Sequence, residues 1–350
     1  MSPLLPSARR HAVALAVGTA LLPLATIATV AVLTPRPAAG HTPPGPTIVV
    51  AADGSGDHRS VQAAIDAVAD NATVQVTILI RPGTYREAIT LPASKTNVRL
   101  CGTGREPDAV VIVDNRSAGT TKPDGTTYGT SGSATATIVG NGFVAENLTI
   151  ANDFDEEAHA DQPGHQAVAL NLSSDRARLH NVRLLGNQDT FYVKDPARVY
   201  VTQSYIEGDV DFIFGGGIAV FERSRIHTLP RGGAITAAST PADRGYGFLF
   251  TNCRFTGTAT TGSTHLGRPW RPHGHVVVRE SSLGRHIAAT QPWTDMSGNP
   301  WTGARFFEYR NTGPGADVNA NRPQLTHAQA RTHTPRHYLA GTDGWNPTRP

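Results

Sequence analysis

The chain has 350 residues, with 31 lysines and arginines against 28 aspartates and glutamates, a formal net charge of +3. Residues 1–40 hold three of the arginines and no acidic residue, so the rest of the chain is formally neutral, which excludes the basic composition typical of nucleic-acid-binding proteins. The two cysteines, Cys101 and Cys253, lie too far apart to form a Cys-x-x-Cys zinc motif.

The first forty residues have the pattern of a secretory signal peptide. Two arginines precede an uncharged apolar run over residues 12–33, and small residues follow that run. The run is also long enough to cross a bilayer, so an uncleaved anchor is the alternative. We expect cleavage and a secreted, extracellular protein with no stable membrane partner. A Pro/Gly linker over residues 41–46 would then lead into a single domain over residues 47–350.

The domain begins with short strands and one helix. Residues 47–50, 76–80 and 89–91 read as strands, with a turn at Pro82-Gly83 between the last two. Ser60 precedes apolar residues at positions 61, 64, 65 and 68, the spacing of a short amphipathic helix with a serine N-cap. Because the end coil of a solenoid exposes strand edges, we expect this helix to cap the domain.

A four-residue motif that is present in six copies predicts a parallel solenoid. Each copy holds a small or apolar residue and, two places on, a large apolar residue, so both face inward. The copies are Asn147–Ile150, Asn181–Leu184, Gln203–Ile206, Arg223–Ile226, Asn252–Phe255 and Glu280–Leu283. Their last residues are 20 to 34 positions apart, a solenoid period with loops of variable length. No long helices separate the copies, which excludes an α/β barrel or a doubly wound sheet and leaves an all-β parallel β-helix.

The end of the chain carries weaker signals. The repeat fades beyond Trp301, residues 326–338 predict a helix, and residues 341–350 read as an irregular tail that packs back on the coils. Several coils would separate Cys101 from Cys253, farther than the roughly 7 Å between Cα atoms that a disulfide allows. Both are therefore expected to be free, buried thiols.

Two aspartates and two glutamines follow the same period. Asp189 and Asp211 lie 22 residues apart, and so do Gln166 and Gln188. If that period is one coil, the aspartates face each other at a rung spacing of about 4.8 Å, with the glutamines beside them. One carboxyl of such a pair is driven towards the neutral acid while the other stays charged beside a cation, for which Arg268 is the candidate. The glutamine amides could donate to a developing oxyanion.

Four aromatic side chains are candidates to stack on sugar rings: Tyr192, Phe214, Trp270 and Trp293. The residues alone leave other interpretations open. The aspartates could be turn formers, the glutamines a side-chain ladder, Arg268 half of a surface ion pair and Trp270 a core aromatic. Two carboxylates about 5 Å apart would also suit a retaining glycosidase.

Five segments, in order, resemble those of pectin methylesterases, the pectinesterase family. They are residues 83–87, 166–170, 186–192, 211–215 and 266–270, and weaker similarity runs from about residue 48 to residue 347. The resemblance implies a right-handed parallel β-helix of the secreted bacterial type. It also implies a monomer that needs no metal or cofactor and acts on methyl-esterified homogalacturonan (pectin), releasing methanol and pectate.

The same resemblance assigns roles to the candidate residues. Asp211 matches the nucleophile that forms an acyl-enzyme, and Asp189 the general acid that later becomes the base. Gln188 and Gln166 match the oxyanion-stabilising amides, and Arg268 the arginine that holds the nucleophile.

Trp270 matches an aromatic residue that contacts substrate. The chain departs from the family pattern at Asn187, where a tyrosine is common, and at Phe191, where a leucine is common; neither changes a chemical group of the predicted site. Two other functions remain as alternatives, an esterase or thioesterase of the same fold with a non-pectin substrate, and a non-catalytic carbohydrate-binding solenoid.

Overall fold

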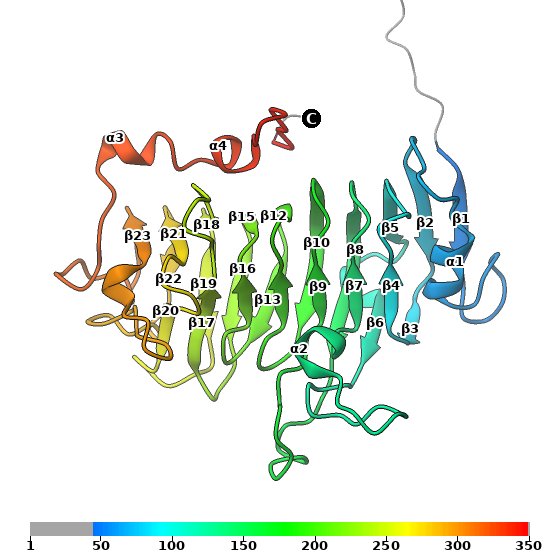
Figure 1. Ribbon diagram of the computed structural model, residues 1–350, viewed down its shortest axis with the longest axis horizontal. Helices are drawn as coiled ribbons and strands as arrows, with labels where there is room; N and C mark the ends of the chain where they lie inside the picture. The colour runs from blue at the N-terminus through cyan, green and yellow to red at the C-terminus, as the bar shows by residue number, and fades with distance from the viewer. Residues whose placement is uncertain (1–44, 349–350) are drawn as a thin grey trace, which may run out of the picture. The chain divides into compact units, whose positions relative to one another are not determined.

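The computed structural model describes residues 45–348, and these wind into a stack of coils with three parallel faces (Figure 1). All pairings between the strands of these faces are parallel, as expected for a parallel β-helix. The predicted signal peptide and most of the predicted linker lie outside the described residues. Among the helices of residues 45–348, none has the length and apolar character required to cross a membrane.

The first face holds ten strands. They are β1 (Thr47–Val50), β2 (Val76–Ile80), β5 (Val98–Gly102), β8 (Val144–Asn152), β10 (Ala177–Leu185), β12 (Arg198–Thr202), β15 (Ile218–Glu222), β18 (Phe248–Thr251), β21 (His275–Arg279) and β23 (Arg305–Tyr309). β8 and β10 are nine residues long and continue around a corner into the second face. There they join β3 (Gly83–Arg86), β6 (Val110–Asp114), β13 (Tyr205–Gly208), β16 (Arg225–Thr228), β19 (Arg254–Gly257) and β22 (Ser282–Leu283).

The third face is a separate sheet of seven strands. In spatial order they are β4 (Ile89–Leu91), β7 (Ala136–Ile138), β9 (Leu170–Leu172), β11 (Phe191–Val193), β14 (Ile213–Gly215), β17 (Gly233–Ala238) and β20 (Thr264–Pro269). Short helical turns interrupt the loops: η1 (Pro107–Ala109), α2 (Gly129–Gly132) and η2 (Trp301–Gly303).

The repeated four-residue motif forms the corner between the first and second faces. The first residue of every copy has a left-handed φ, between 49° and 54°. The last residues are direct partners from coil to coil, in the order Ile150, Leu184, Ile206, Ile226, Phe255 and Leu283. All six are buried in the core, so the predicted repeat and its inward direction are confirmed.

The prediction that the repeat fades beyond Trp301 is wrong by one coil. β23 pairs with β21, and Arg310 after it adopts the same left-handed corner, with φ of 50°. Gly313 occupies the place of the large apolar residue in this copy, which removed the signal from the sequence. The predicted strands at residues 47–50, 76–80 and 89–91 are confirmed.

The N-terminal helix caps the first coils as predicted. α1 (Val61–Ala67) begins after Ser60, whose hydroxyl accepts a hydrogen bond from the Ala63 amide at 3.2 Å. Val61, Ala64 and Ile65 are buried against the core. This contact covers the open end of the sheet that begins with β1 (Figure 1).

The predicted C-terminal helix is two short helices instead of one. α3 (His327–Ala330) begins with a capping box, and α4 (Pro335–Leu339) begins at a proline. Proline has no N–H to donate to a preceding turn, so it starts a new helix rather than extending α3. The intervening Thr334 is extended, with φ of −123°.

The C-terminal segment packs on the first face, as the sequence predicts. α4 contacts β12 and β15, and Figure 1 shows it lying beside those strands. Tyr338 is fully buried there and stacks on Tyr246 at 4.3 Å between ring centroids. Arg198 donates hydrogen bonds to Asp343 and to the carbonyl of Leu339, which fastens the segment to β12.

Both cysteines are free thiols, as expected. Cys253 is buried in the core, and burial raises the pKa of its thiol to about 12. Cys101 is only partly buried, so the prediction of burial is wrong for this residue. It occupies an alternate position of β5 between the inward-facing Leu100 and Gly102, and alternate residues of a strand point to opposite faces.

Candidate active site

Most of the candidate residues line one cavity on the third face. The cavity has a volume of about 490 Å³, and its walls include Gln166, Gln188, Asp189 and Asp211. The aromatic candidates Tyr192, Phe214 and Trp270 line it too. The coiling therefore brings together residues that are more than a hundred positions apart in the sequence.

Asp189 and Asp211 occupy equivalent corners of neighbouring coils. Each lies two residues before a strand residue, Phe191 or Ile213, and these two are direct partners in β11 and β14. The period of 22 residues is therefore one coil at this point, as predicted. Both aspartates have a left-handed φ, 69° and 51°, a conformation that Asp adopts more readily than most residues. They are 7% and 5% exposed.

The glutamines keep the 22-residue register of the aspartates. The Ala167 amide donates to the Gln188 carbonyl at 3.1 Å, in the same pattern as the Asp189 amide to the Val210 carbonyl, so Gln166 lies on the rung next to Gln188. The offset changes to 21 residues only at the start of β9, where Leu170 pairs with Phe191. Both glutamine side chains line the cavity beside the aspartates.

Arg268 reaches Asp211 from two strands away. Its Nε donates to Oδ1 and its Nη2 to Oδ2 of Asp211, each at 2.7 Å. Arg268 lies in β20, and Ala237 of the intervening strand β17 pairs with both Arg268 and Phe214. The small side chain at position 237 leaves room for the guanidinium to cross. The alternative of an ordinary surface ion pair does not fit, because the Asp211 side chain is only 7% exposed.

The charges around the two aspartates are unequal. Burial raises the pKa of Asp189 well above its usual range, and the neighbouring Asp211 carboxylate raises it further. Burial also raises the pKa of Asp211, but the hydrogen bonds and charge of Arg268 oppose that shift. The site therefore favours a neutral Asp189 beside a charged Asp211.

Three aromatic side chains form one wall of the cavity. Tyr192 and Phe214 stack at 4.3 Å between ring centroids, and the Trp270 ring lies 6.2 Å from Tyr192 and 6.0 Å from Phe214. Phe214 is almost completely buried, whereas Tyr192 and Trp270 are partly exposed. Tyr192 and Trp270 thus present the larger accessible aromatic surface.

Trp293 is not part of this wall. Its side chain is fully buried and stacks on Phe306 at 4.7 Å, inside the core at the C-terminal end of the coils. Its backbone pairs with Gly267, which directs the ring inward. The prediction that Trp293 contacts substrate is therefore wrong.

Other lining residues come from loops that the sequence pattern did not identify. Tyr128 and residues 129–131 enter the cavity from the long loop between β6 and β7, and Met296 enters from the loop between β22 and η2. The Arg116 guanidinium lies 4.7 Å from the centre of the Tyr128 ring, which holds this loop in place. These loops carry no periodicity or motif, so no sequence signal distinguished their lining residues.

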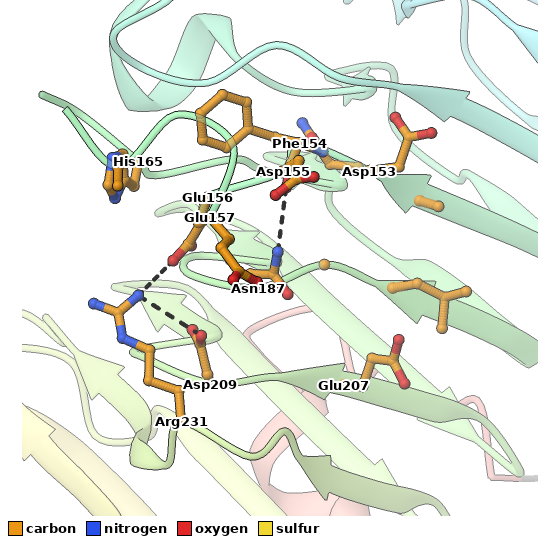
Figure 2. A pocket seen from close by; sticks show the side chains of 15 residues that line it. Asp153, Phe154, Asp155, Glu156, Glu157, His165, Asn187, Glu207, Asp209 and Arg231 are labelled. Carbon is orange, nitrogen blue, oxygen red and sulfur yellow. Dashed lines mark hydrogen bonds and ion pairs between the residues drawn. The ribbon is translucent and has the colours of Figure 1, made fainter. Parts of the chain in front are cut away.

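A second cavity of about 840 Å³ is lined by Asn187, the residue before Gln188, and by the loop between β8 and β9 (Figure 2). Glu156 accepts a hydrogen bond from the Gln188 backbone amide at 3.3 Å and forms an ion pair with Arg231. Arg231 also lies 3.8 Å from Asp209, and burial raises the pKa of Asp209 to about 6. Asn187 donates to the Phe154 carbonyl at 3.2 Å. The loop between β8 and β9 is therefore tied to the corner that positions Gln188.

A metal centre is not apparent at either cavity. Within residues 45–348, no group of three or more His, Cys, Asp or Glu side chains is arranged to hold a metal ion. The polar groups that converge on the first cavity are instead carboxyl, amide and guanidinium groups.

Comparisons with known proteins agree with this geometry. A family model described as Pectinesterase matches residues 47–342. A pectinesterase of Ralstonia solanacearum is 40% identical over 314 residues, covering 76% of this chain and 79% of its own length. The structure is similar to that of pectin methylesterase PemA from Erwinia chrysanthemi, with a TM-score of 0.77 and 34% identity over 87% of this chain and 98% of the other. A pectin methylesterase solved in complex with a hexasaccharide matches with a TM-score of 0.76, at the same identity and coverage.

Proposed function

Since this chain belongs to the pectinesterase family and is a carboxylic ester hydrolase with pectin methylesterase activity, we propose that Asp211 is its nucleophile and Asp189 its general acid and base. The observation that carries this assignment is the asymmetry of the pair. Arg268 holds both oxygens of Asp211 at 2.7 Å, while burial and the charge of Asp211 favour a proton on Asp189. One carboxyl group is therefore a nucleophile and the other an acid.

The first half of the proposed reaction forms an acyl-enzyme. A carboxylate oxygen of Asp211 attacks the carbonyl carbon of a methyl-esterified galacturonate unit. The side-chain amides of Gln188 and Gln166 donate hydrogen bonds to the resulting oxyanion. When the tetrahedral intermediate collapses, the bond to the methoxy oxygen breaks, and Asp189 gives its proton to that oxygen. Methanol leaves, and the galacturonyl group remains as an anhydride with Asp211.

The second half hydrolyses the anhydride. Asp189, now a carboxylate, takes a proton from water as the water oxygen attacks the galacturonyl carbon. The same two amides stabilise the second oxyanion. Collapse breaks the bond to Asp211, which regains its carboxylate, and Asp189 is protonated again. The released acid loses its proton to solvent, so one ester and one water give methanol, a galacturonate carboxylate and a proton.

The substrate proposed for this cavity is pectin, that is, methyl-esterified homogalacturonan. A related pectin methylesterase has been solved with a hexasaccharide, and the partly exposed rings of Tyr192 and Trp270 are suited to contact sugar rings. We further propose that residues 1–40 are a cleaved secretory signal, residues 41–46 a linker and residues 47–350 one domain. The enzyme would act outside the cell as a monomer, without a metal or cofactor.

The proposed function predicts that the purified protein releases methanol and new carboxyl groups from methylated pectin in equal amounts. A thioesterase acting on another substrate, or a solenoid that only binds carbohydrate, would release none. The check is a methanol assay run in parallel with titration of the acid formed. Absence of methanol from a folded preparation would contradict the function.

Arg268 should set the pH at which the enzyme becomes active on the acid side. Its charge and hydrogen bonds lower the pKa of Asp211, so Arg268→Ala should raise that pKa, and a higher pH is then needed to ionise the nucleophile. The acid limb of the kcat/KM profile should therefore move upward. Arg268→Lys should recover part of the shift, because lysine restores the charge but not the two-point hydrogen bonding.

The measurement is the pH profile of kcat/KM for the wild type and both variants. Arg105→Ala serves as the matched control, because Arg105 is exposed and remote from the cavity. An acid limb that stays in place in Arg268→Ala would show that Arg268 does not control the charge of Asp211.

A further inference from the structure

A row of arginines crosses the outer surface of the second face. Arg183 in β10, Tyr205 in β13, Arg225 in β16 and Arg254 in β19 are direct partners in successive strand pairs. The residues that follow them in each strand are buried, so the four side chains project outward. Four adjacent rungs extend over about 14 Å along the coil axis.

Tyr205 holds the two guanidinium groups on either side of it. The Arg183 guanidinium carbon lies 5.5 Å from the centre of the Tyr205 ring, and that of Arg225 lies 5.7 Å from it. Both distances suit cation–π contacts. The Tyr205 hydroxyl donates to Glu207 at 2.6 Å, and the Arg225 Nε donates to the Thr256 hydroxyl at 2.9 Å. The row is therefore ordered by its own contacts.

The positive charge of the row is poorly compensated within the protein. Among the described residues, only Arg183 of these three arginines has a carboxylate within 4.0 Å, that of Asp108 at 3.9 Å. Arg225 and Arg254 are exposed and directly opposite each other on adjacent strands. Like charges in that arrangement repel and cost stability. A ligand with several negative charges would remove this cost.

The row is separate from the catalytic cavity but belongs to the same coils. The cavity opens on the third face, and two strands of the row, β10 and β13, directly precede the corners that carry Asp189 and Asp211. Glu207 and Asp209 lie between the row and Asp211 along the chain, so acidic groups separate the two surfaces. A polyanion on the row would thus not be a simple extension of the chain in the cavity.

We propose that Arg183, Tyr205, Arg225 and Arg254 form a second binding surface that holds de-esterified stretches of the polymer by their carboxylates. This inference rests on the proposed function, because removal of methyl esters turns a neutral polymer into a linear polyanion. The surface binds the product form of the polymer rather than the ester. It keeps the enzyme attached to chains that already carry de-esterified blocks, while esters are hydrolysed in the cavity.

The test replaces all three arginines together, as Arg183→Gln, Arg225→Gln and Arg254→Gln. Affinity for polygalacturonate should fall about tenfold or more, and its dependence on salt should weaken, because fewer charges are neutralised on binding. KM for pectin with de-esterified blocks should rise. Methanol release from a short, fully methylated oligogalacturonide should be unchanged in kcat and KM, because that substrate uses only the cavity.

The matched control removes three exposed arginines elsewhere, as Arg59→Gln, Arg331→Gln and Arg336→Gln. This variant has the same net charge and should bind polygalacturonate as the wild type does. Equal losses in the two triple variants, or no loss in the first, would overturn the proposal. The single reversal Arg254→Glu gives a second test with less change to the surface, and unchanged polygalacturonate affinity in that variant would also overturn it. Methanol release from the short oligogalacturonide reports separately on the proposed function.

Discussion

Asp211→Ala should abolish methanol release from pectin while the protein remains folded. The expected loss is on the order of 10⁴-fold or more in kcat, as for removal of the nucleophile in other covalent hydrolases. Asp211 is the carboxylate held on both oxygens by Arg268, at 2.7 Å each, and it opens onto the cavity. Without it, no group can form the acyl-enzyme. Methanol assays and thermal unfolding of the same preparation test the two parts of this expectation.

Two further variants complete the experiment: Asp211→Asn, which preserves the shape of the side chain, and Asp209→Asn, which is a control at a nearby buried carboxyl. Asparagine at position 211 keeps the shape of the side chain but cannot attack, so activity should be lost unless the amide slowly hydrolyses, which mass spectrometry detects. Asp209 is also a buried carboxyl, two residues away, but it lines the second cavity with Arg231. Its replacement should retain most of the turnover. Turnover near the wild-type level in Asp211→Ala would refute the assignment of the nucleophile.

Gln188→Ala should lower kcat by about 10²–10³-fold, the usual effect of removing one oxyanion donor. Its side chain lines the cavity beside Asp189, and Glu156 fixes its backbone amide from behind. The donor is needed most when negative charge develops on the substrate oxygen, so the loss should appear in kcat. Steady-state kinetics on a methylated oligogalacturonide separate kcat from KM.

Gln188→Glu provides the matched variant, because it keeps the size of the side chain but replaces the amide donor with an acceptor. It should be at least as impaired as Gln188→Ala. An effect of Gln188→Ala confined to KM would mean that the side chain only binds substrate, and the proposed oxyanion site would then need another donor.

The sequence predicted the coils and the aspartate pair because neighbours in a solenoid are one period apart. The four-residue motif whose copies end at Ile150, Leu184 and Ile206 marks a corner that is present once per coil. In the structure, these last residues are direct strand partners on adjacent coils. The same spacing places Asp189 against Asp211. In such a fold, two residues that are one period apart in the sequence are neighbours on adjacent coils.

The features that could not be predicted from the sequence lie in segments that do not follow the coil repeat. Tyr128 and Glu156 belong to the long loops after β6 and β8, whose course depends on contacts such as that between Arg116 and Tyr128. Only the chemical type of Trp293 favours a place at the site, and without a strand period nothing in the sequence indicates that its ring faces the core. The last coil was missed because Gly313 replaces its large apolar residue.

The turns between the second and third faces differ in length from coil to coil. This difference separates the choice of substrate from the positions of the reacting carboxyl groups. The corners at residues 186–190 and 209–212, which carry the aspartates, are short, whereas residues 115–135 and 153–169 make the same crossing by long loops on earlier coils. Loop insertions cost little when the ends are already held by paired strands. Evolution or an engineer can therefore lengthen or exchange these loops, apart from the end of the second loop that carries Gln166, to alter which polymer fits, while Asp189 and Asp211 stay anchored to the short corners.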